Sequence, residues 1–469
     1  MMYDPHLHLF VDEAEIEASW NVTPTIGRPE ARTHDPIMAA DRPWEGRGVG
    51  LDLSVLRDPG SGTFRMWYRS LNDQQPETDK NLLNYAESAD GLAWTKPDLG
   101  LIEYDGSTAT NIIHRPGLIA GCRAMEAHGL IVDDVGGPAR RYKMPVYHSF
   151  TDRAADGLYA LFSPDGIAWT LHPTPTVPQA GDRHSAIKDA ASGDYVLYLR
   201  PPRYLAPRGG EPMPPGSEAL PYKRIVARAT SQDFLTWSDF TTVLRNDVFD
   251  TPGSEFYNIA PVIYGNRYIA FVNLYDTAVE RMWVTLASSL DGVTWHRPHR
   301  LTRILDLGPE GRWDDSWVNV SDSPPVREGD RMRFWYHGRA EAHGLTYRTG
   351  AVGSFVLGLD RFAGLAAGQQ AGTIVTDRVE AGGDRLFLNA NVRNGAARVD
   401  VRTDDMTPIP GLGLHDCDEI RGDHVDHAVT WNGNADLSRL RGQRVRLRIE
   451  FSYGQVFAYR FGDAPRDLS

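Results

Sequence analysis

Hydrophobic and aromatic residues occur along this chain in short runs, and Gly, Pro, Asp and Asn separate most of these runs. Helical spacing, with apolar residues three and four positions apart, is nearly absent; only residues 12–20 and 436–442 suggest a turn or two of helix. Short apolar runs bounded by turn-forming residues are typical of β-strands. The pattern therefore predicts an all-β protein.

A seven-residue motif occurs four times, as SADGLAW (88–94), SPDGIAW (163–169), SQDFLTW (231–237) and SLDGVTW (289–295). Ser stands first, Asp third and Trp seventh in every copy, and Gly stands fourth in three copies. Asp caps a turn through its side chain and Gly supplies a positive φ, so the motif predicts a β-turn with Trp folded back onto a strand pair. Four copies in one register indicate a repeated structural unit.

A second repeated element is an apolar and aromatic strand, found as RMWYRS (65–70), KMPVYHS (143–149), YVLYLRP (195–201), YIAFVNL (268–274) and RFWYHGR (333–339). Successive seven-residue motifs begin 75, 68 and 58 residues apart. These periods fit the four-stranded blades of a β-propeller with loops of variable length. We therefore expect a five-bladed β-propeller over residues 45–362, whose fifth blade lacks the motif.

The pattern changes after residue 362. Residues 363–372 (AGLAAGQQAG) read as a small-residue linker. Alternating or apolar runs then follow at 386–392, 397–403, 443–453 and 456–461. They predict a C-terminal antiparallel β-sandwich over residues 372–469, and residues 1–44 are expected to be an N-terminal extension that packs on the propeller.

Five blades with these turns, a Pro-Trp-Glu sequence at 43–45 and a C-terminal sandwich resemble the five-bladed glycoside hydrolases of the family 32/43/68 (furanosidase) superfamily. The likeness is strongest to an uncharacterised, family-32-like bacterial branch, and it covers nearly the whole chain. The N-D-P-N-G and E-C motifs of that superfamily are absent, and the R-D-P at 57–59 lies in a turn, where Asp58 looks structural. The resemblance implies a glycosidase whose active site lies in the propeller funnel.

Glycoside hydrolysis needs two carboxyl groups, one to protonate the leaving oxygen and one to act as nucleophile or to activate water. The first strand of each propeller blade lines the central channel, so acidic residues at the blade entrances converge there. Aligning the blades by their repeats places an acidic residue at every entrance: Asp52, Glu126, Asp182, Glu255, and Asp314 with Asp315.

Among these acids, Glu255 is predicted to be the general acid, because Phe256 and Tyr257 flank it and burial raises the pKa of a carboxyl group. Its catalytic partner is predicted to be Asp182 or Asp52; the resembling families keep their nucleophile or base in the first blade. The residues expected to bind substrate are Trp44, Glu126, His184, Arg200, Tyr257, Asp314 and His337.

Two histidine-rich segments suggest metal sites, but neither has a recognised ligand spacing. His6 and His8 imitate a motif of metal-dependent barrel enzymes, a fold that needs alternating strands and helices. Residues 415–427 are rich in His and acids and lie in the expected sandwich. Two cysteines are too few for a disulfide framework. We therefore expect no metal, no other cofactor and no disulfide.

The chain has 49 Lys and Arg against 62 Asp and Glu, a net charge of −13, and no basic cluster. This balance argues against nucleic acids and anionic membranes as partners and leaves an oligosaccharide or glycoside substrate. No run reaches the roughly 18 apolar residues of a membrane-spanning helix, and the first residues lack a signal-peptide pattern. A cytoplasmic location is expected, and the formation of a homo-oligomer is left open by the sequence.

Three functions remain at this point. The first is hydrolysis or transglycosylation of a furanoside, such as a fructofuranoside or an arabinofuranoside. The second is a glycoside phosphorylase, for which Arg200, Arg203 and His184 would form the phosphate pocket. The third is non-catalytic carbohydrate binding.

Overall fold

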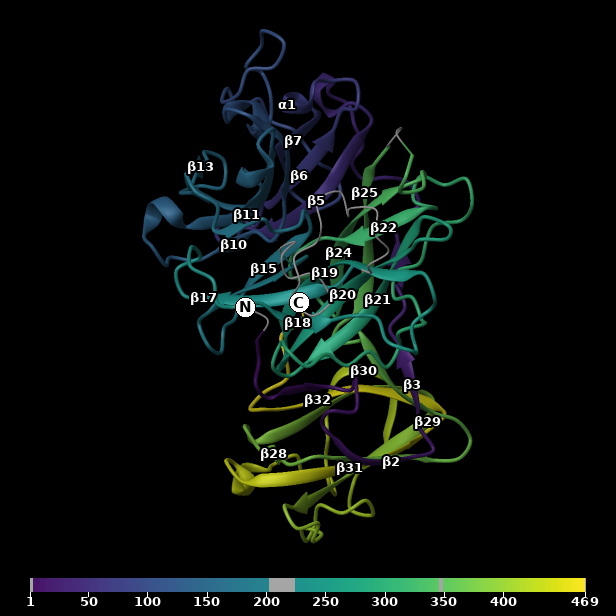
Figure 1. Ribbon diagram of the computed structural model, residues 1–469. Coiled ribbons are helices and arrows are strands. Elements are labelled where there is room, and N and C mark those ends of the chain that lie inside the picture. The colour runs from purple at the N-terminus through teal and green to yellow at the C-terminus, as the bar shows by residue number, and fades with distance from the viewer. Residues whose placement is uncertain (1–2, 202–223, 346–348, 469) are drawn as a thin grey trace.

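The computed structural model describes residues 3–201, 224–345 and 349–468, and nearly all of their regular structure is β-strand (Figure 1). One α-helix, α1 (Glu77–Lys80), occurs in these ranges. Short 3-10 turns are η1 (Pro43–Glu45), η2 (Pro116–Leu118), η3 (Pro138–Arg140), η4 (Arg153–Ala155) and η7 (Ser438–Leu440). None of the helices in these ranges is long and apolar enough to cross a membrane. The expected fold, a five-bladed β-propeller followed by an antiparallel β-sandwich, is confirmed.

The first three blades are separate antiparallel sheets. Blade 1 contains β5 (Gly48–Arg57), β6 (Phe64–Leu71), β7 (Asn81–Ser88) and β8 (Ile112–His114). Blade 2 contains β9 (Cys122–Ala127), β10 (Ile131–Val132), β11 (Tyr142–Phe150), β12 (Gly157–Ser163), β13 (Thr170–Leu171) and β14 (Val177–Pro178). Blade 3 contains β15 (His184–Lys188), β16 (Tyr195–Leu199), β17 (Val226–Ser231) and β18 (Thr241–Leu244). In each blade the first strand faces the centre of the propeller.

Blades 4 and 5 are joined into one sheet, but only through a parallel pair between Met282 and Trp317. Blade 4 contains β19 (Ser254–Tyr264), β20 (Arg267–Asp276) and β21 (Arg281–Ser289). Blade 5 contains β22 (Trp317–Val320), β23 (Val326–Glu328), β24 (Arg331–Arg339) and β25 (Ala351–Gly358). Its outermost strand is β4 (Ala31–Arg32), which comes from the N-terminal segment and pairs with β25.

The four seven-residue motifs form the same turn. In each copy the Ser hydroxyl bonds the Asp carboxylate at 2.9 Å. The same carboxylate accepts hydrogen bonds from the backbone N–H groups two and three residues further on. Such an Asp-capped turn is what the motif predicts.

The turns also join neighbouring blades. The indole N–H of Trp67, in blade 1, donates to the carbonyl of Gly166, in the turn of blade 2, at 2.6 Å. Trp335, in blade 5, donates in the same way to Gly91, in the turn of blade 1, at 2.8 Å. Gly91 has φ +73°, and a Cβ there would come within 2.8 Å of the Trp335 ring, so this position requires glycine. The Trp335 bond closes the ring between the last blade and the first.

The sandwich is a ten-stranded sheet folded over an apolar core. Its strands after the propeller are β26 (Ala363–Ala367), β27 (Gly372–Thr376), β28 (Val379–Glu380), β29 (Arg385–Thr403), β30 (Ile420–Ala428), β31 (Arg444–Ser452) and β32 (Gly454–Gly462). The first part of β29 pairs with β32 and its second part with β31, so this one strand runs through both layers. The expected linker at 363–372 is wrong in its first half, because residues 363–367 are buried as β26 between β3 and β32.

The N-terminal segment belongs to both parts of the molecule. Strands β1 (Leu7–Leu9), β2 (Ile16–Trp20) and β3 (Thr23–Ile26) pair with β32, β27 and β26 of the sandwich. Leu7, Leu9 and Val11 join a buried cluster that contains propeller residues and Ala458 of the sandwich. The purple segment in Figure 1 therefore ties the sandwich to the propeller.

Candidate active site

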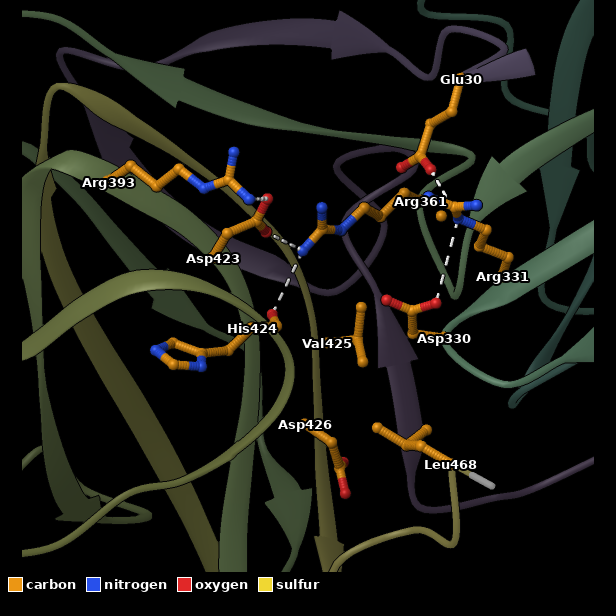
Figure 2. A pocket seen from close by; sticks show the side chains of 11 residues that line it. Glu30, Asp330, Arg331, Arg361, Arg393, Asp423, His424, Val425, Asp426 and Leu468 are labelled. Carbon is orange, nitrogen blue, oxygen red and sulfur yellow. Dashed lines mark hydrogen bonds and ion pairs between the residues drawn. The ribbon is translucent and has the colours of Figure 1, made fainter.

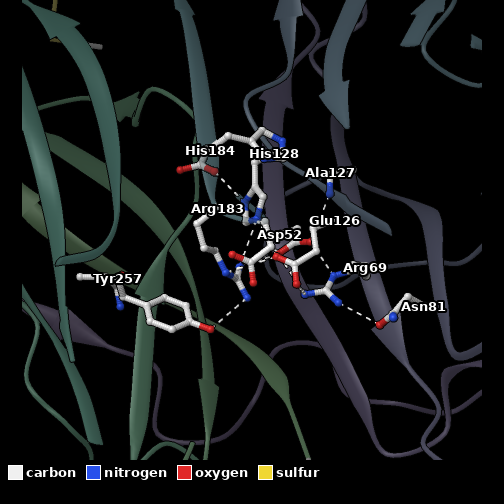
Figure 3. A network of polar contacts seen from close by, with 12 residues as sticks. Asp52, Arg69, Asn81, Glu126, Ala127, His128, Arg183, His184 and Tyr257 are labelled. Atoms are coloured by element: carbon white, nitrogen blue, oxygen red, sulfur yellow. Dashed lines mark hydrogen bonds and ion pairs between the residues drawn. The ribbon is translucent and has the colours of Figure 1, made fainter. Parts of the chain in front are cut away.

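Side chains from three blades meet at a buried carboxylate in the centre of the propeller, that of Asp52 (Figure 3). Asp52 lies in an irregular part of β5 and has φ +53°, a conformation that Asp tolerates better than most residues. Its oxygens lie 2.5 Å from Arg69 Nε, 3.0 Å from Arg183 Nη1 and 2.8 Å from His128 Nε2. The side chain of Asp52 has no solvent exposure.

The protonation states of Asp52 and His128 are set by the charged side chains around them. Burial alone would raise the pKa of Asp52, but the positive charges of its three partners hold that pKa well below its ordinary value. Burial alone would lower the pKa of His128, but Asp52 and Asp322 raise it well above its ordinary value. Asp322 Oδ2 lies 3.0 Å from His128 Nδ1. Asp52 is therefore an anion and His128 a cation.

Three further carboxylates lie around this network and keep partial exposure. Glu126 lies beside Asp52, 3.2 Å from Arg183 Nε and 3.5 Å from Arg69 Nη2. Asp182 forms an ion pair with Arg200, and Glu255 forms one with Arg224. The side chains of Glu126, Asp182 and Glu255 are 17%, 37% and 12% exposed. These acids, unlike Asp52, can contact a bound molecule.

Tyr257 brings the two ion pairs together. The guanidinium groups of Arg183, Arg200 and Arg224 lie 4.9, 5.7 and 5.6 Å from the centroid of its ring. Its hydroxyl lies 3.5 Å from Arg183 Nη2, as Figure 3 shows. The ring of Trp317 lies 5.2 Å away, edge to face. Asp182 and Glu255 are 73 residues apart in the sequence, but their arginine partners pack on the same tyrosine ring.

The charge of Asp182 follows from the same arginines. Burial alone would raise the pKa of this carboxyl group, but the positive charges of Arg200 and Arg183 outweigh burial and lower it. Asp182 is therefore ionised, as a catalytic base or nucleophile must be.

Two of the expected substrate-binding residues lie elsewhere. The indole of Trp44, in η1, donates to Asn111 at 2.9 Å and packs in a small cluster on blade 1 with Leu82 and Ile112. Asp314 accepts hydrogen bonds from Arg32 and Tyr336 and so fastens β4 to blade 5. No contact in the described ranges connects either residue with Tyr257 or Asp52.

His184 and His337 lie close to the site but behind its surface. His184 Nε2 lies 3.0 Å from the carbonyl of Pro145, and the ring of His337 lies 6.1 Å from that of Trp317. Burial lowers the pKa of each to about 3, so both are neutral. Arg203, the third residue of the expected phosphate pocket, lies outside the described residues.

Sequence reasoning missed Arg69, His128, Arg224 and Asp322. Arg69 lies in the repeated strand 65–70, and the other three lie outside the repeated elements. The one available signal was the occurrence of charged residues at the ends of otherwise apolar strands, which is common at turns.

A metal ion does not fit the centre. Ligand atoms of Asp52, Glu126 and His128 lie within 4.8 Å of one another, the one such group in the described ranges. Arg69 and Arg183 already occupy the Asp52 oxygens, and their positive charges oppose a cation. In residues 415–427, His424 Nε2 is bound to the carbonyl of Arg421 instead of joining a ligand cluster.

Two larger clefts lie where the propeller meets the sandwich, with volumes of about 390 and 560 Å³. In the first, the charged side chains pair with one another (Figure 2). Asp423 binds Arg361 and Arg393, at 2.5 and 3.2 Å, and Glu30 binds Arg331 at 3.2 Å. Glu30, Asp330, Asp423 and Asp426 line this cleft, but the described residues of its lining include no Phe, Tyr or Trp, so it lacks the aromatic wall found around Tyr257.

No protein-family model matches this chain, and no curated protein matches it. Solved structures resemble it at low identity. An N-acetylgalactosamine deacetylase from F. plautii, in complex with blood group B trisaccharide, is 14% identical, with a TM-score of 0.47 over 72% of this chain and 96% of that one. A fructofuranosidase variant from Schwanniomyces occidentalis, complexed with fructosylnystose, is 9% identical, with a TM-score of 0.44 over 91% and 97%. A thermostable family-43 glycoside hydrolase is 14% identical, with a TM-score of 0.42 over 66% and 90%. Likenesses this distant leave the activity to be argued from the site.

Proposed function

We propose that this protein is a glycoside hydrolase or transglycosylase that cleaves a furanoside, such as a fructofuranoside or an arabinofuranoside, at Tyr257. The observation that carries the proposal is the pair of partly exposed acids, Asp182 and Glu255, that flank this tyrosine through their arginines. An aromatic surface between two carboxyl groups suits the binding and cleavage of a sugar. The resemblance of the repeats to furanosidases supports the choice of sugar.

In this mechanism Glu255 is the general acid that protonates the leaving oxygen, and the ionised Asp182 acts as nucleophile or activates water. Glu255 must carry a proton when it acts, which requires its ion pair with Arg224 to open. Asp52 is a positioning residue, because its carboxylate holds Arg183 against Tyr257 without touching substrate. A separation between the carboxyl groups of about 5–5.5 Å in the complex implies retention, and one of about 6.5–9.5 Å implies inversion.

The test is a comparison of Glu255→Gln on natural furanosides and on aryl furanosides. The variant should lose about 10²-fold or more on natural substrates, whose leaving groups need a proton. It should lose much less on aryl substrates with good leaving groups. Glu103→Gln, at an exposed position on blade 1, is the matched control and should leave both activities unchanged.

Equal losses on both substrates would remove Glu255 from the acid role. If the unmodified protein turns over no furanoside, with or without added phosphate, the proposed function is wrong. Cleavage that strictly requires phosphate would instead show a phosphorylase.

A further inference from the structure

The candidate active site contains as many basic groups as acids, although the whole chain has a net charge of −13. Its basic groups are Arg69, His128, Arg183, Arg200 and Arg224, and its acids are Asp52, Glu126, Asp182, Glu255 and Asp322. When Glu255 carries the proton that the proposed mechanism requires, Arg224 loses its charged partner. The Arg224 guanidinium is then left without an anionic partner, which a single anionic group on the substrate would supply.

Arg200 has hydrogen-bonding capacity that the protein does not use. It pairs with Asp182 through Nη1 alone. Its Nε and Nη2 are shielded from solvent and have no hydrogen-bond partner among the described residues. These two N–H groups form one edge of the planar guanidinium group, and two parallel donors on such an edge match the two oxygens of a carboxylate.

A second group with unused hydrogen-bonding capacity, Asn258, lines the same cavity as Arg200. Asn258 is 5% exposed, and neither its amide nitrogen nor its amide oxygen has a partner among the described residues. Arg183, Arg200, Tyr257 and Asn258 together line a small cavity of about 10 Å³, which has room for about one water molecule, so a larger group would bind at its mouth. A buried donor without a partner is costly, so a ligand that accepts hydrogen bonds from these groups would be favoured here.

We propose that the glycoside carries a carboxylate next to the bond that is cleaved, as an acidic sugar residue does, and that Arg200 binds this carboxylate with help from Arg224. The inference rests on the proposed function and adds the class of substrate. A carboxylate fits better than inorganic phosphate for two reasons. It is planar, like the free edge of Arg200, and its single charge is repelled less by Glu126 and Asp182 than a phosphate dianion would be.

The test is a binding measurement by isothermal titration calorimetry on the Glu255→Gln variant, so that no turnover interferes. The probes are D-glucuronate, D-galacturonate, their uncharged methyl esters and inorganic phosphate. At least one acid should bind about tenfold or more tightly than its ester, because the ester cannot accept charge-assisted hydrogen bonds from both N–H groups. Equal binding of acid and ester, no binding of either, or tighter binding of phosphate would overturn the proposal.

Arg200→Lys tests the residue itself, because it keeps the positive charge and removes the paired donors. The variant should lose about tenfold or more in affinity for the acid and little for the ester. Arg303→Lys, at an exposed ion pair with Asp306, is the matched control and should change neither. An unchanged thermal unfolding temperature would establish that both variants fold; if Arg200→Lys does not, Arg224→Lys provides the same comparison with a smaller expected loss.

The two proposals fail in different ways. Preferential binding of the acid without hydrolysis of any glycoside would refute the proposed function and leave the carboxylate site standing. Hydrolysis of neutral furanosides, together with equal binding of acid and ester, would refute the carboxylate site and leave the proposed function standing.

Discussion

Replacing Asp52 by Asn removes the charge at the centre of the propeller and turns one of two acceptor oxygens, which bind Arg69, Arg183 and His128, into an NH₂ donor. Asn has almost the shape of Asp and also tolerates a positive φ, so the backbone at +53° is kept. The Asn oxygen can still accept the hydrogen bond from the N–H of Ala127, which is 3.2 Å long. The substitution therefore keeps the packing of the side chain and removes its charge together with one hydrogen-bond acceptor.

The expected cost follows from the partners that remain. Removing one member of a buried ion pair typically costs about 3–5 kcal/mol, because the other charge stays buried without compensation. Here Glu126 still pairs with Arg69 and Arg183, and Asp322 still pairs with His128. We therefore expect the lower end of that range, about 3 kcal/mol of unfolding free energy.

The assay is urea unfolding at neutral pH, followed by tryptophan fluorescence and far-UV circular dichroism. Asp105→Asn is the matched control, because Asp105 is exposed and has φ +50°. It should change the unfolding free energy by less than about 0.5 kcal/mol. In an Arg183→Gln background the cost of Asp52→Asn should shrink by about 1 kcal/mol, because one of the uncompensated charges is gone.

A loss below about 1 kcal/mol for Asp52→Asn would refute this reasoning. It would mean that water or a rearranged Glu126 replaces the missing charge at little cost. The network would then be a consequence of the converging blades and would contribute little to holding them together.

Other expectations concern pH, the closure of the ring and metal dependence. Burial lowers the pKa of His114 to about 4 and also lowers the pKa of His148. Both histidines therefore bind protons more readily in the unfolded chain, and the unfolding free energy should fall as the pH drops below about 6.5 towards 4. His114→Gln should reduce this slope in urea titrations at several pH values, and an unchanged slope would contradict the assignment. Trp335→Phe removes the hydrogen bond to Gly91 and should lower the unfolding free energy by about 1–2 kcal/mol. Trp20→Phe, at an exposed position, is the control and should change it by nothing measurable. Equal urea midpoints for the two variants would argue against the interblade bond. Neither EDTA nor a reductant should shift the midpoint of the unmodified protein, and a shift would reveal a structural metal or disulfide.

Much of the fold could be predicted because its signals are local. The turn of residues 163–169 forms from the contacts of Ser163 and Asp165 with their own neighbours, and these residues repeat in four of the five blades. The repeats also place Asp182 and Glu255 at blade entrances, and the structure brings their arginine partners to the same aromatic ring. The local sequence pattern therefore predicts the ring of blades and the positions at the blade entrances.

The parts that could not be predicted depend on contacts between distant residues. Whether a central carboxylate is open or closed depends on what covers it, and Asp52 is covered by Arg69, His128 and Arg183 from three blades. Strand β4 has only two residues, one of them charged, and becomes a strand because β25 offers it a free edge. No local pattern reports either fact.

The N-terminal segment has a consequence for the timing of synthesis. Leu9 in β1 pairs with Ala458 in β32, so 449 residues separate the two strands along the chain. At about 5–20 residues per second, a ribosome needs roughly 20 to 90 seconds to cover that distance. Throughout this interval β1 has been made but its partner strand has not, and β2 and β3 wait for partners that follow them by about 340 to 360 residues. Strands with open edges readily pair with other chains, so this interval is when a nascent chain is most exposed to misassembly on a crowded polysome. Synthesis rate and chaperone supply should therefore affect the yield of this protein more than the stability of the finished fold suggests.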